Sequence, residues 1–152
     1  MADIRIKIAK DKAQLLKALR PEDPSERTFQ SYADALVFAA ALGMRQGRRE
    51  PIKEYSKEID PIRQDIFTGK GYDQVINLLA VADTNDPRIV ASNEAAEEER
   101  IKIFEEYANA GLEIIEEIFR GSVDYSEQLL LFLGSEKNSS EEGVEFDLSN
   151  FL

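Results

Sequence analysis

Residues 93–119 read N-E-A-A-E-E-E-R-I-K-I-F-E-E-Y-A-N-A-G-L-E-I-I-E-E-I-F, and this stretch decides the fold class. Its apolar residues recur in steps of three and four, the spacing of one helix face. Asn93 is placed to cap the first turn. Gly111 costs about 1 kcal/mol relative to alanine, so we expect tight packing around it. The expected core face comprises Ile101, Phe104, Ala108, Leu112, Ile115 and Phe119.

A second strong helix signal begins at Ser31, a capping residue followed by an almost uninterrupted apolar run to Met44. Because the run is apolar nearly all round, we expect a central, buried helix whose alanines allow another helix to approach closely. Gly47 is a plausible end signal for it. The residues from Glu50 to Pro61 look like a connector. Further helices are predicted over Asp11 to Leu19, Pro61 to Phe67, Tyr72 to Ala80 and Tyr125 to Leu133.

The N-terminal segment from Asp3 to Lys10 alternates isoleucine with charged residues, which predicts a half-buried β-strand. No second convincing strand is visible, so we expect the strand to pair with another copy of the chain, giving a homo-oligomer. Strand, helix and helix over residues 3–49 is also the layout of ribbon-helix-helix DNA readers. On spacing alone, an ordinary polar strand beside a cationic helix end is the favoured interpretation.

The sequence thus predicts a mainly α, multi-helix bundle with one short N-terminal β-strand. We expect a single domain over residues 1–133, with residues 3–49 as a possible DNA-binding or dimerisation subregion, followed by an acidic tail over residues 134–152. The tail has an apolar end that could dock on a partner or fold back on the domain. Its candidate contact residues are Val144, Phe146, Leu148, Phe151 and Leu152.

The 152 residues include no histidine and no cysteine, which removes the commonest general base, metal ligand and thiol nucleophile. We therefore expect no enzymatic activity, no cofactor and no metal site. The start of the chain, M-A-D-I-R-I-K-I-A-K-D-K, lacks the apolar core of a secretory signal, and no apolar run has the length of a membrane span. These features predict a cytoplasmic protein that makes no contact with a membrane.

The net charge of −11 is unevenly distributed. Residues 1–50 hold ten Lys and Arg against seven Asp and Glu, whereas residues 51–152 hold nine against twenty-three. A basic first part can face an anion such as DNA. The acidic remainder is read first as a solubilising surface, and alternatively as a surface that imitates DNA. The candidate DNA-contacting residues are Arg5, Lys7, Lys10, Arg45, Arg48 and Arg49.

Two other patterns are read as structural. The long predicted helix carries the carboxylates of Glu94, Glu97, Glu98, Glu99, Glu105 and Glu106. Carboxylates can hold a hard cation, but a solvated acidic face is the favoured interpretation. Gly69-Lys70-Gly71 is too short for a phosphate-binding loop.

Several whole segments resemble the DNA phosphorothioation-associated protein 4 family. They are I-R-I-K-I-A-K-D-K (Ile4 to Lys12), S-Y-A-D-A-L-V-F-A-A-A-L-G (Ser31 to Gly43), G-R-R-E-P (Gly47 to Pro51), Y-D-Q-V-I-N-L-L-A-V-A (Tyr72 to Ala82) and R-I-K-I-F-E-E-Y-A-N-A-G-L-E-I (Arg100 to Ile114). The likeness covers most of residues 3–133 and leaves out the tail after Gly134.

That family accompanies prokaryotic gene clusters that replace a non-bridging phosphate oxygen of DNA with sulfur, and the linked restriction genes. The resemblance implies an accessory role in such a system, with its modification or restriction subunits as partners and DNA as a candidate partner. It supplies no catalytic residues. The alternative is an acidic adaptor, or a DNA-mimicking inhibitor of a restriction subunit.

Overall fold

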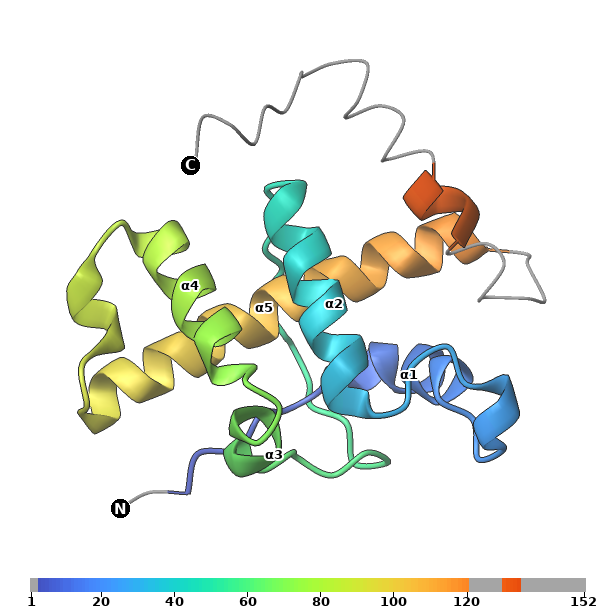
Figure 1. Cartoon of the computed structure of the whole chain (residues 1–152), viewed down its shortest axis with the longest axis horizontal. Coiled ribbons are helices and arrows are strands. Elements are labelled where there is room, and N and C mark those ends of the chain that lie inside the picture. The colour runs from blue at the N-terminus through green and yellow to red at the C-terminus, as the bar shows by residue number, and fades with distance from the viewer. Residues whose placement is uncertain (1–2, 121–129, 135–152) are drawn as a thin grey trace.

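Helix α5 (Glu94–Phe119) is the axis around which the rest of the molecule is arranged (Figure 1). The computed structural model describes residues 3–120 and 130–134. The Oδ1 atom of Asn93 accepts the backbone N–H of Ala96 at 2.8 Å, which confirms the predicted cap. The other helices in chain order are the 3₁₀ turn Lys10–Lys12, α1 (Ala13–Leu19), the 3₁₀ turn Pro24–Glu26, α2 (Tyr32–Arg45), α3 (Gln64–Thr68), α4 (Asp73–Thr84) and the 3₁₀ turn Pro87–Val90.

Helix α2 crosses α5 at a contact that small residues make possible. A Cβ atom on Gly111 would overlap the carbonyl oxygen of Ala39, and one on Gly43 would overlap that of Tyr107. The two backbones therefore touch, as the sequence predicted for Gly111 and for the alanines of α2. The Ser31 hydroxyl accepts the N–H of Asp34 at 3.1 Å and begins α2 as expected.

The prediction that α2 is the central helix is wrong. Its exposed and partly exposed positions include Ala41, Val37 and Phe38, so α2 lays one face on α5. Helix α5 is the element buried all round, over residues 103–112. Apolar composition alone does not decide which helix is central, because a polar side chain is also buried where neighbours satisfy it.

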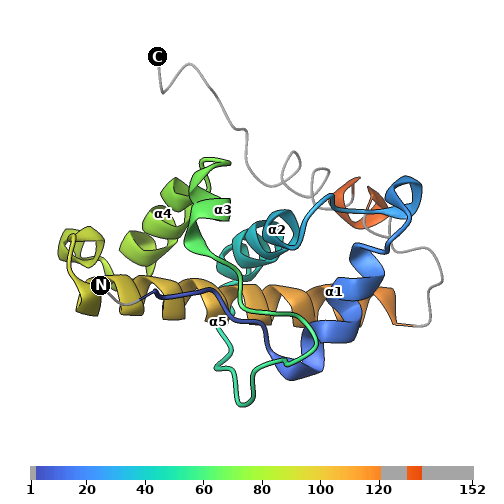
Figure 2. The ribbon, with the colours of Figure 1, turned by 90° about the horizontal axis from the view of Figure 1, so that it is seen from below.

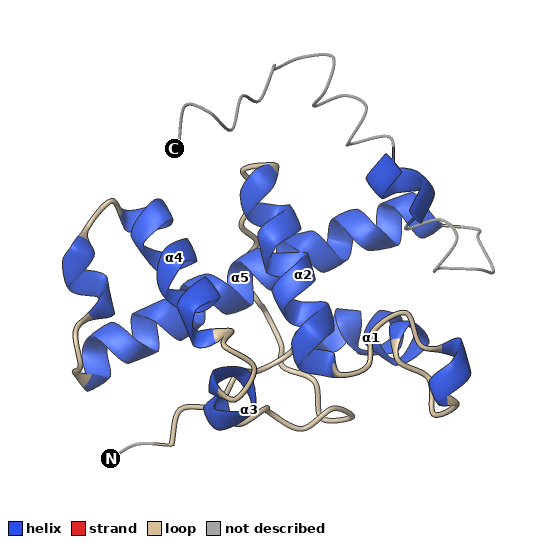
Figure 3. Cartoon of the chain, in the orientation of Figure 1, coloured by secondary structure: helices blue, strands red, loops and turns tan. Residues whose placement is uncertain are grey.

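The N-terminal segment is extended but is not a β-strand, and Figure 3 colours no strand among the described residues. Only isolated bridges form, from Ile6 to Ile62 and from Ala9 to Tyr55. Ile6 and Ile62 exchange two N–H to carbonyl bonds of 2.9 and 2.8 Å. The predicted alternation is correct, since Ile6 and Ile8 are buried while Arg5 and Lys7 are exposed.

These bonds also correct the ribbon-helix-helix hypothesis for residues 3–49. The segment finds its backbone partners in residues 54–62 of the same chain, so it needs no strand from another copy. The argument for a homo-oligomer through this segment loses its basis.

Helices α3 and α4 lie on the same side of α5 as α2 (Figure 2). Helix α3 is fixed by an edge-to-face contact between Phe67 and Phe104, with ring centroids 5.6 Å apart. Of the helix predicted over Tyr125 to Leu133, only residues 130–134 are described, and they are helical. Membrane crossing needs a long, continuously apolar helix, and the described part of the chain contains none.

Candidate binding face

The side of α5 opposite α2 and α4 is covered mostly by irregular chain, with the 3₁₀ turn Lys10–Lys12 and the start of α1 at one end. In Figure 2 the connection after α2 passes α5 and emerges on this side, and the N-terminal segment runs along α5 beside it. We call this surface the connector face. It consists of the N-terminal segment (residues 3–10), the connector (residues 50–61) and the residues of α5 beneath them.

Two grooves lie on the connector face, with volumes of about 730 and 690 Å³. Pro51 of the connector contributes to the lining of both, so the connector separates them. Grooves of this size accommodate a peptide segment or a small ligand.

Backbone groups of the connector are held down on α5 by polar contacts. Asn109 donates from Nδ2 to the carbonyl oxygens of Glu50 at 3.1 Å and of Pro51 at 3.4 Å. Glu50 N–H donates to the carbonyl oxygen of Glu106 at 3.1 Å. Farther along the connector, the backbone N–H of Ser56 donates to the carbonyl oxygen of Ile8 at 2.7 Å. The connector is therefore attached to both α5 and the N-terminal segment.

The first groove combines an apolar lining with charges of both signs. Its apolar residues are Ile4, Pro51, Ile52, Pro61 and Ile101. Its cations are Arg5, Lys7 and Lys102, and its acids include Asp3, Glu98 and Glu105. The Lys7 ammonium lies 4.7 Å from the ring centroid of Tyr55, which is 48% exposed. An exposed aromatic ring beside a cation is a common recognition element.

The second groove is more strongly charged. Lys10 pairs with Glu54 at 3.3 Å, and both side chains are about 70% exposed. Lys12 is only 3% exposed, with its Nζ atom 3.0 Å from Asp11. The long alkyl chain of Lys12 is thus buried while its ammonium reaches a surface carboxylate.

The six candidate DNA-contacting residues fall into three groups. Arg5, Lys7 and Lys10 lie together on the connector face. Arg45 and Arg48 lie at the C-terminal end of α2, on the other side of α5 from the N-terminal segment in Figure 1. The structure therefore does not bring all six to one surface.

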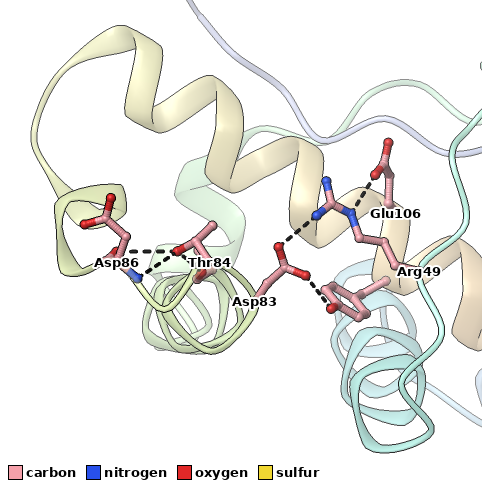
Figure 4. Close-up of polar contacts among 7 residues, drawn as sticks. Arg49, Asp83, Thr84, Asp86 and Glu106 are labelled. Atoms are coloured by element: carbon pink, nitrogen blue, oxygen red, sulfur yellow. Dashed lines mark hydrogen bonds and ion pairs between the residues drawn. The ribbon is translucent and has the colours of Figure 1, made fainter.

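Arg49 forms a third group by itself, because it is the centre of an internal polar cluster (Figure 4). Its guanidinium donates to Asp83 at 2.8 Å and to Glu106 at 2.7 Å. The Tyr107 hydroxyl donates to the same Asp83 at 2.5 Å. Burial, and then the hydrogen bond to Asp83, raise the pKa of Tyr107 to about 12. Arg49 thus joins the end of α4 to α5 and to the chain leaving α2.

Three polar residues of α5 are buried, which their sequence pattern did not indicate. Glu105, Glu106 and Asn109 are 8, 9 and 7% exposed. The interpretation of Glu105 and Glu106 as part of a solvated acidic face is wrong. Both lie in the longest fully buried run among the described residues, next to Tyr107 and Ala108. The signal that could have identified them is their position in the middle of the longest apolar stripe.

Glu105 is the most perturbed of these groups. Its Oε2 atom accepts the backbone N–H of Lys7 at 2.6 Å. Burial raises the pKa of Glu105 to about 7, and the charge of Glu106 adds to this, although the Lys7 N–H and ammonium oppose it.

Two other expectations concern binding sites. Among residues 3–120 and 130–134, no three acidic side chains come together in a way that could hold a metal ion. The tail residues Val144, Phe146, Leu148, Phe151 and Leu152 lie outside the described residues.

A comparison with protein families gives the biological setting. No curated protein and no solved structure matches the chain. The model of one family, DNA sulphur modification system-associated protein 4, matches residues 5–151. This match confirms the resemblance and extends it to the tail after Gly134. The chain therefore belongs to the DNA sulphur modification system-associated protein 4 family.

Proposed function

We propose that this chain is a non-catalytic accessory protein of a DNA sulphur modification system and that it binds another protein of that system through the connector face. The observation that carries the proposal is the pair of grooves on either side of the connector. They lie on the side of α5 that α2 and α4 leave uncovered. Family membership supplies the setting.

The mixture of charges favours a protein as the primary partner. A DNA backbone presents uniform negative charge, and it would meet Asp3 and Glu98 in the first groove and Glu54 and Glu113 in the second. A protein segment can present both signs of charge together with apolar side chains, which matches the lining of the first groove.

The proposal of a non-catalytic role rests on the residue types in the sequence. Sulfur transfer to DNA would normally use a cysteine thiolate, and the chain has no cysteine. General base catalysis most often uses histidine, which is also absent from the sequence. We therefore assign the sulfur chemistry and any DNA cleavage to partner subunits.

Calorimetric titration of the purified chain against each purified protein of its own modification system tests the primary proposal. We expect Lys7→Glu/Lys102→Glu, which reverses two charges of the first groove, to weaken binding at least about tenfold. Arg45→Glu/Arg88→Glu makes the same change of charge outside the connector face and should leave the affinity within about twofold. Equal losses in both double variants would contradict binding at this face.

The tail residues have a separate test in the same titration. A chain that stops at Gly134 should retain binding if the connector face is sufficient. Loss of binding in this truncated chain alone would instead assign partner recognition to Val144, Phe146, Leu148, Phe151 and Leu152.

DNA contact is a second candidate, favoured by the placement of Arg5, Lys7 and Lys10 on the connector face, with Lys7 over the exposed ring of Tyr55. The surface ion pairs of Arg5 with Asp3 and of Lys10 with Glu54 are weak enough to be exchanged for phosphates. Arg49 is not included in this group. A contact between Arg49 and DNA would leave the carboxylates of Asp83 and Glu106 without their cation.

Gel-shift titration on plain and sulfur-modified duplexes at several salt concentrations tests the DNA candidate. Three phosphate contacts predict that the affinity falls with salt with a logarithmic slope of about −3. Arg5→Ala/Lys7→Ala/Lys10→Ala should abolish the shift, while Arg45→Ala/Arg48→Ala should not. Binding that ignores salt, or that survives the triple substitution, would exclude this mode.

A further inference from the structure

A buried acceptor without a donor lies beneath the connector. The Nδ2 atom of Asn109 is used by the carbonyl oxygens of Glu50 and Pro51. Its Oδ1 atom is fully buried and has no hydrogen-bond partner among the described residues. Exchanging the two amide atoms would set Oδ1 against two carbonyl oxygens, so the orientation is fixed. A buried acceptor without a donor costs about 1–3 kcal/mol, which makes a hidden donor worth seeking.

A group able to supply a proton is Glu105, which lies one helical turn earlier on α5. Glu105 and Asn109 line the same small cavity, of about 10 Å³. The cavity is otherwise lined mostly by apolar side chains, including those of Ile6, Leu36 and Leu112. This volume is close to the least that holds one water molecule.

The two oxygens of Glu105 are not equivalent. Oε2 accepts the N–H of Lys7, so it is engaged as an acceptor. Oε1 is the atom left to carry a proton. A neutral carboxyl group can therefore accept from Lys7 with one oxygen and donate with the other.

We propose that Glu105 and Asn109 form a proton-dependent latch. The neutral Glu105 carboxyl donates from Oε1 to Asn109 Oδ1 across the small cavity, directly or through one water. In this state α5 holds the N-terminal segment through Lys7 and the connector through Glu50 and Pro51. Loss of the proton leaves two acceptors facing each other and loosens the floor of the first groove.

The charges around Glu105 are consistent with a neutral carboxyl. The charge of Glu106 beside it favours the neutral form, and Glu106 itself pairs with Arg49 at 2.7 Å. The side chain of Lys7 lies over the Tyr55 ring. Helix α2 contributes only the apolar side chain of Leu36 to the lining of the cavity. The remaining charged groups of the groove are Asp3, Arg5, Glu98 and Lys102.

The latch sets the direction of a pH effect. Burial raises the pKa of Glu105 to about 7, whereas the unfolded chain ionises near 4.5. Between these values the folded chain retains a proton that the unfolded chain has lost. The free energy of unfolding therefore includes the full contribution of this proton at low pH. The contribution decreases as the pH rises from about 4.5 to 7 and does not change further above pH 7.

Carboxyl carbon-13 NMR of the full chain tests the proton directly. One glutamate resonance, identified by its absence in Glu105→Gln, should titrate near pH 7. Asn109→Ala removes the acceptor for the proton and should shift this midpoint to lower pH. A Glu105 resonance that titrates near pH 4.5, or whose midpoint does not respond to Asn109→Ala, would overturn the proposal.

Denaturant unfolding across pH provides the second test. In Glu105→Gln the amide can donate to Asn109 and its oxygen can accept from Lys7, so the variant mimics the neutral state. We expect its unfolding constant to lie within about twofold of that of the unmodified chain at pH 4.5 and to be about 300-fold smaller at pH 8.5. Glu98→Gln, an exposed acid of the same groove, is the matched control and should not alter the pH profile. Identical profiles for the two variants would contradict the latch.

Discussion

The two sides of α5 are built in different ways. Toward α2, the helix presents Gly111 and meets the backbone of Ala39 with no side chain between them. Toward the connector, it presents Glu105 and Asn109, which hold irregular chain by hydrogen bonds. Backbone contact between small residues leaves no room for adjustment, whereas polar contacts to loops can be exchanged for others. We infer that the α2 side is the fixed scaffold and that the connector side is the adaptable surface.

The largest effect is expected from Gly111→Ala, which tests the rigidity of the α2 side. The added methyl group would overlap the backbone of Ala39, so the helices must separate. We expect a loss of about 3 kcal/mol or more in the free energy of unfolding, measured in denaturant. Gly134→Ala has no heavy atom within 4 Å of its new methyl group and serves as the control. A loss below about 1 kcal/mol at Gly111 would show that the crossing can adjust.

The next effect is expected from Arg49→Ala, at the boundary between the two sides. This change leaves Glu106 and Asp83 without their cation, and Glu106 is only 9% exposed. We expect a loss of about 2 kcal/mol, below the value for a fully buried pair because Arg49 is partly exposed. Arg48→Ala removes a surface pair with Glu117 and should cost less than about 1 kcal/mol. Equal losses of stability in Arg49→Ala and Arg48→Ala would mean that the internal cluster contributes no more than a surface ion pair.

A smaller effect is expected within the connector from Ser56→Ala. The buried Ser56 hydroxyl accepts the N–H groups of Glu58 at 3.1 Å and Ile59 at 3.2 Å. Losing this turn should cost about 1 kcal/mol. It should also speed amide hydrogen exchange in residues 54–62 while leaving α2 unchanged. Faster exchange in α2 as well would show that the two sides unfold together.

The smallest effect is expected from Lys10→Ala. Its ion pair with Glu54 is exposed on both partners, and such pairs contribute little. The free energy of unfolding should change by less than about 0.5 kcal/mol in thermal or denaturant melts. A loss above 1 kcal/mol would mean that the N-terminal segment depends on this pair for its position.

The same contrast explains which features could be predicted from the sequence. The caps at Ser31 and Asn93 and the close packing at Gly111 are local signals, and the structure confirms them. They depend on residue types within one turn of a helix. The mainly helical class follows from the same signals.

The connector side could not be predicted in this way, because its contacts join residues far apart in the chain. Lys7 meets Glu105, and Asn109 meets Glu50. The alternation of apolar and charged residues in the N-terminal segment correctly predicted the buried isoleucines. It did not indicate that residues 54–62 provide the backbone hydrogen-bond partners of this segment. The burial of Glu106 likewise depends on Arg49, which no periodicity places beside it.

Hydrogen exchange on the complex with a partner protein of the system tests the central claim most directly. Binding at the connector face should slow amide exchange in residues 3–10 and 50–61 and leave the outer face of α4 unchanged. Protection confined to α4, or to the outer face of α2, with residues 3–10 and 50–61 unaffected, would contradict the account.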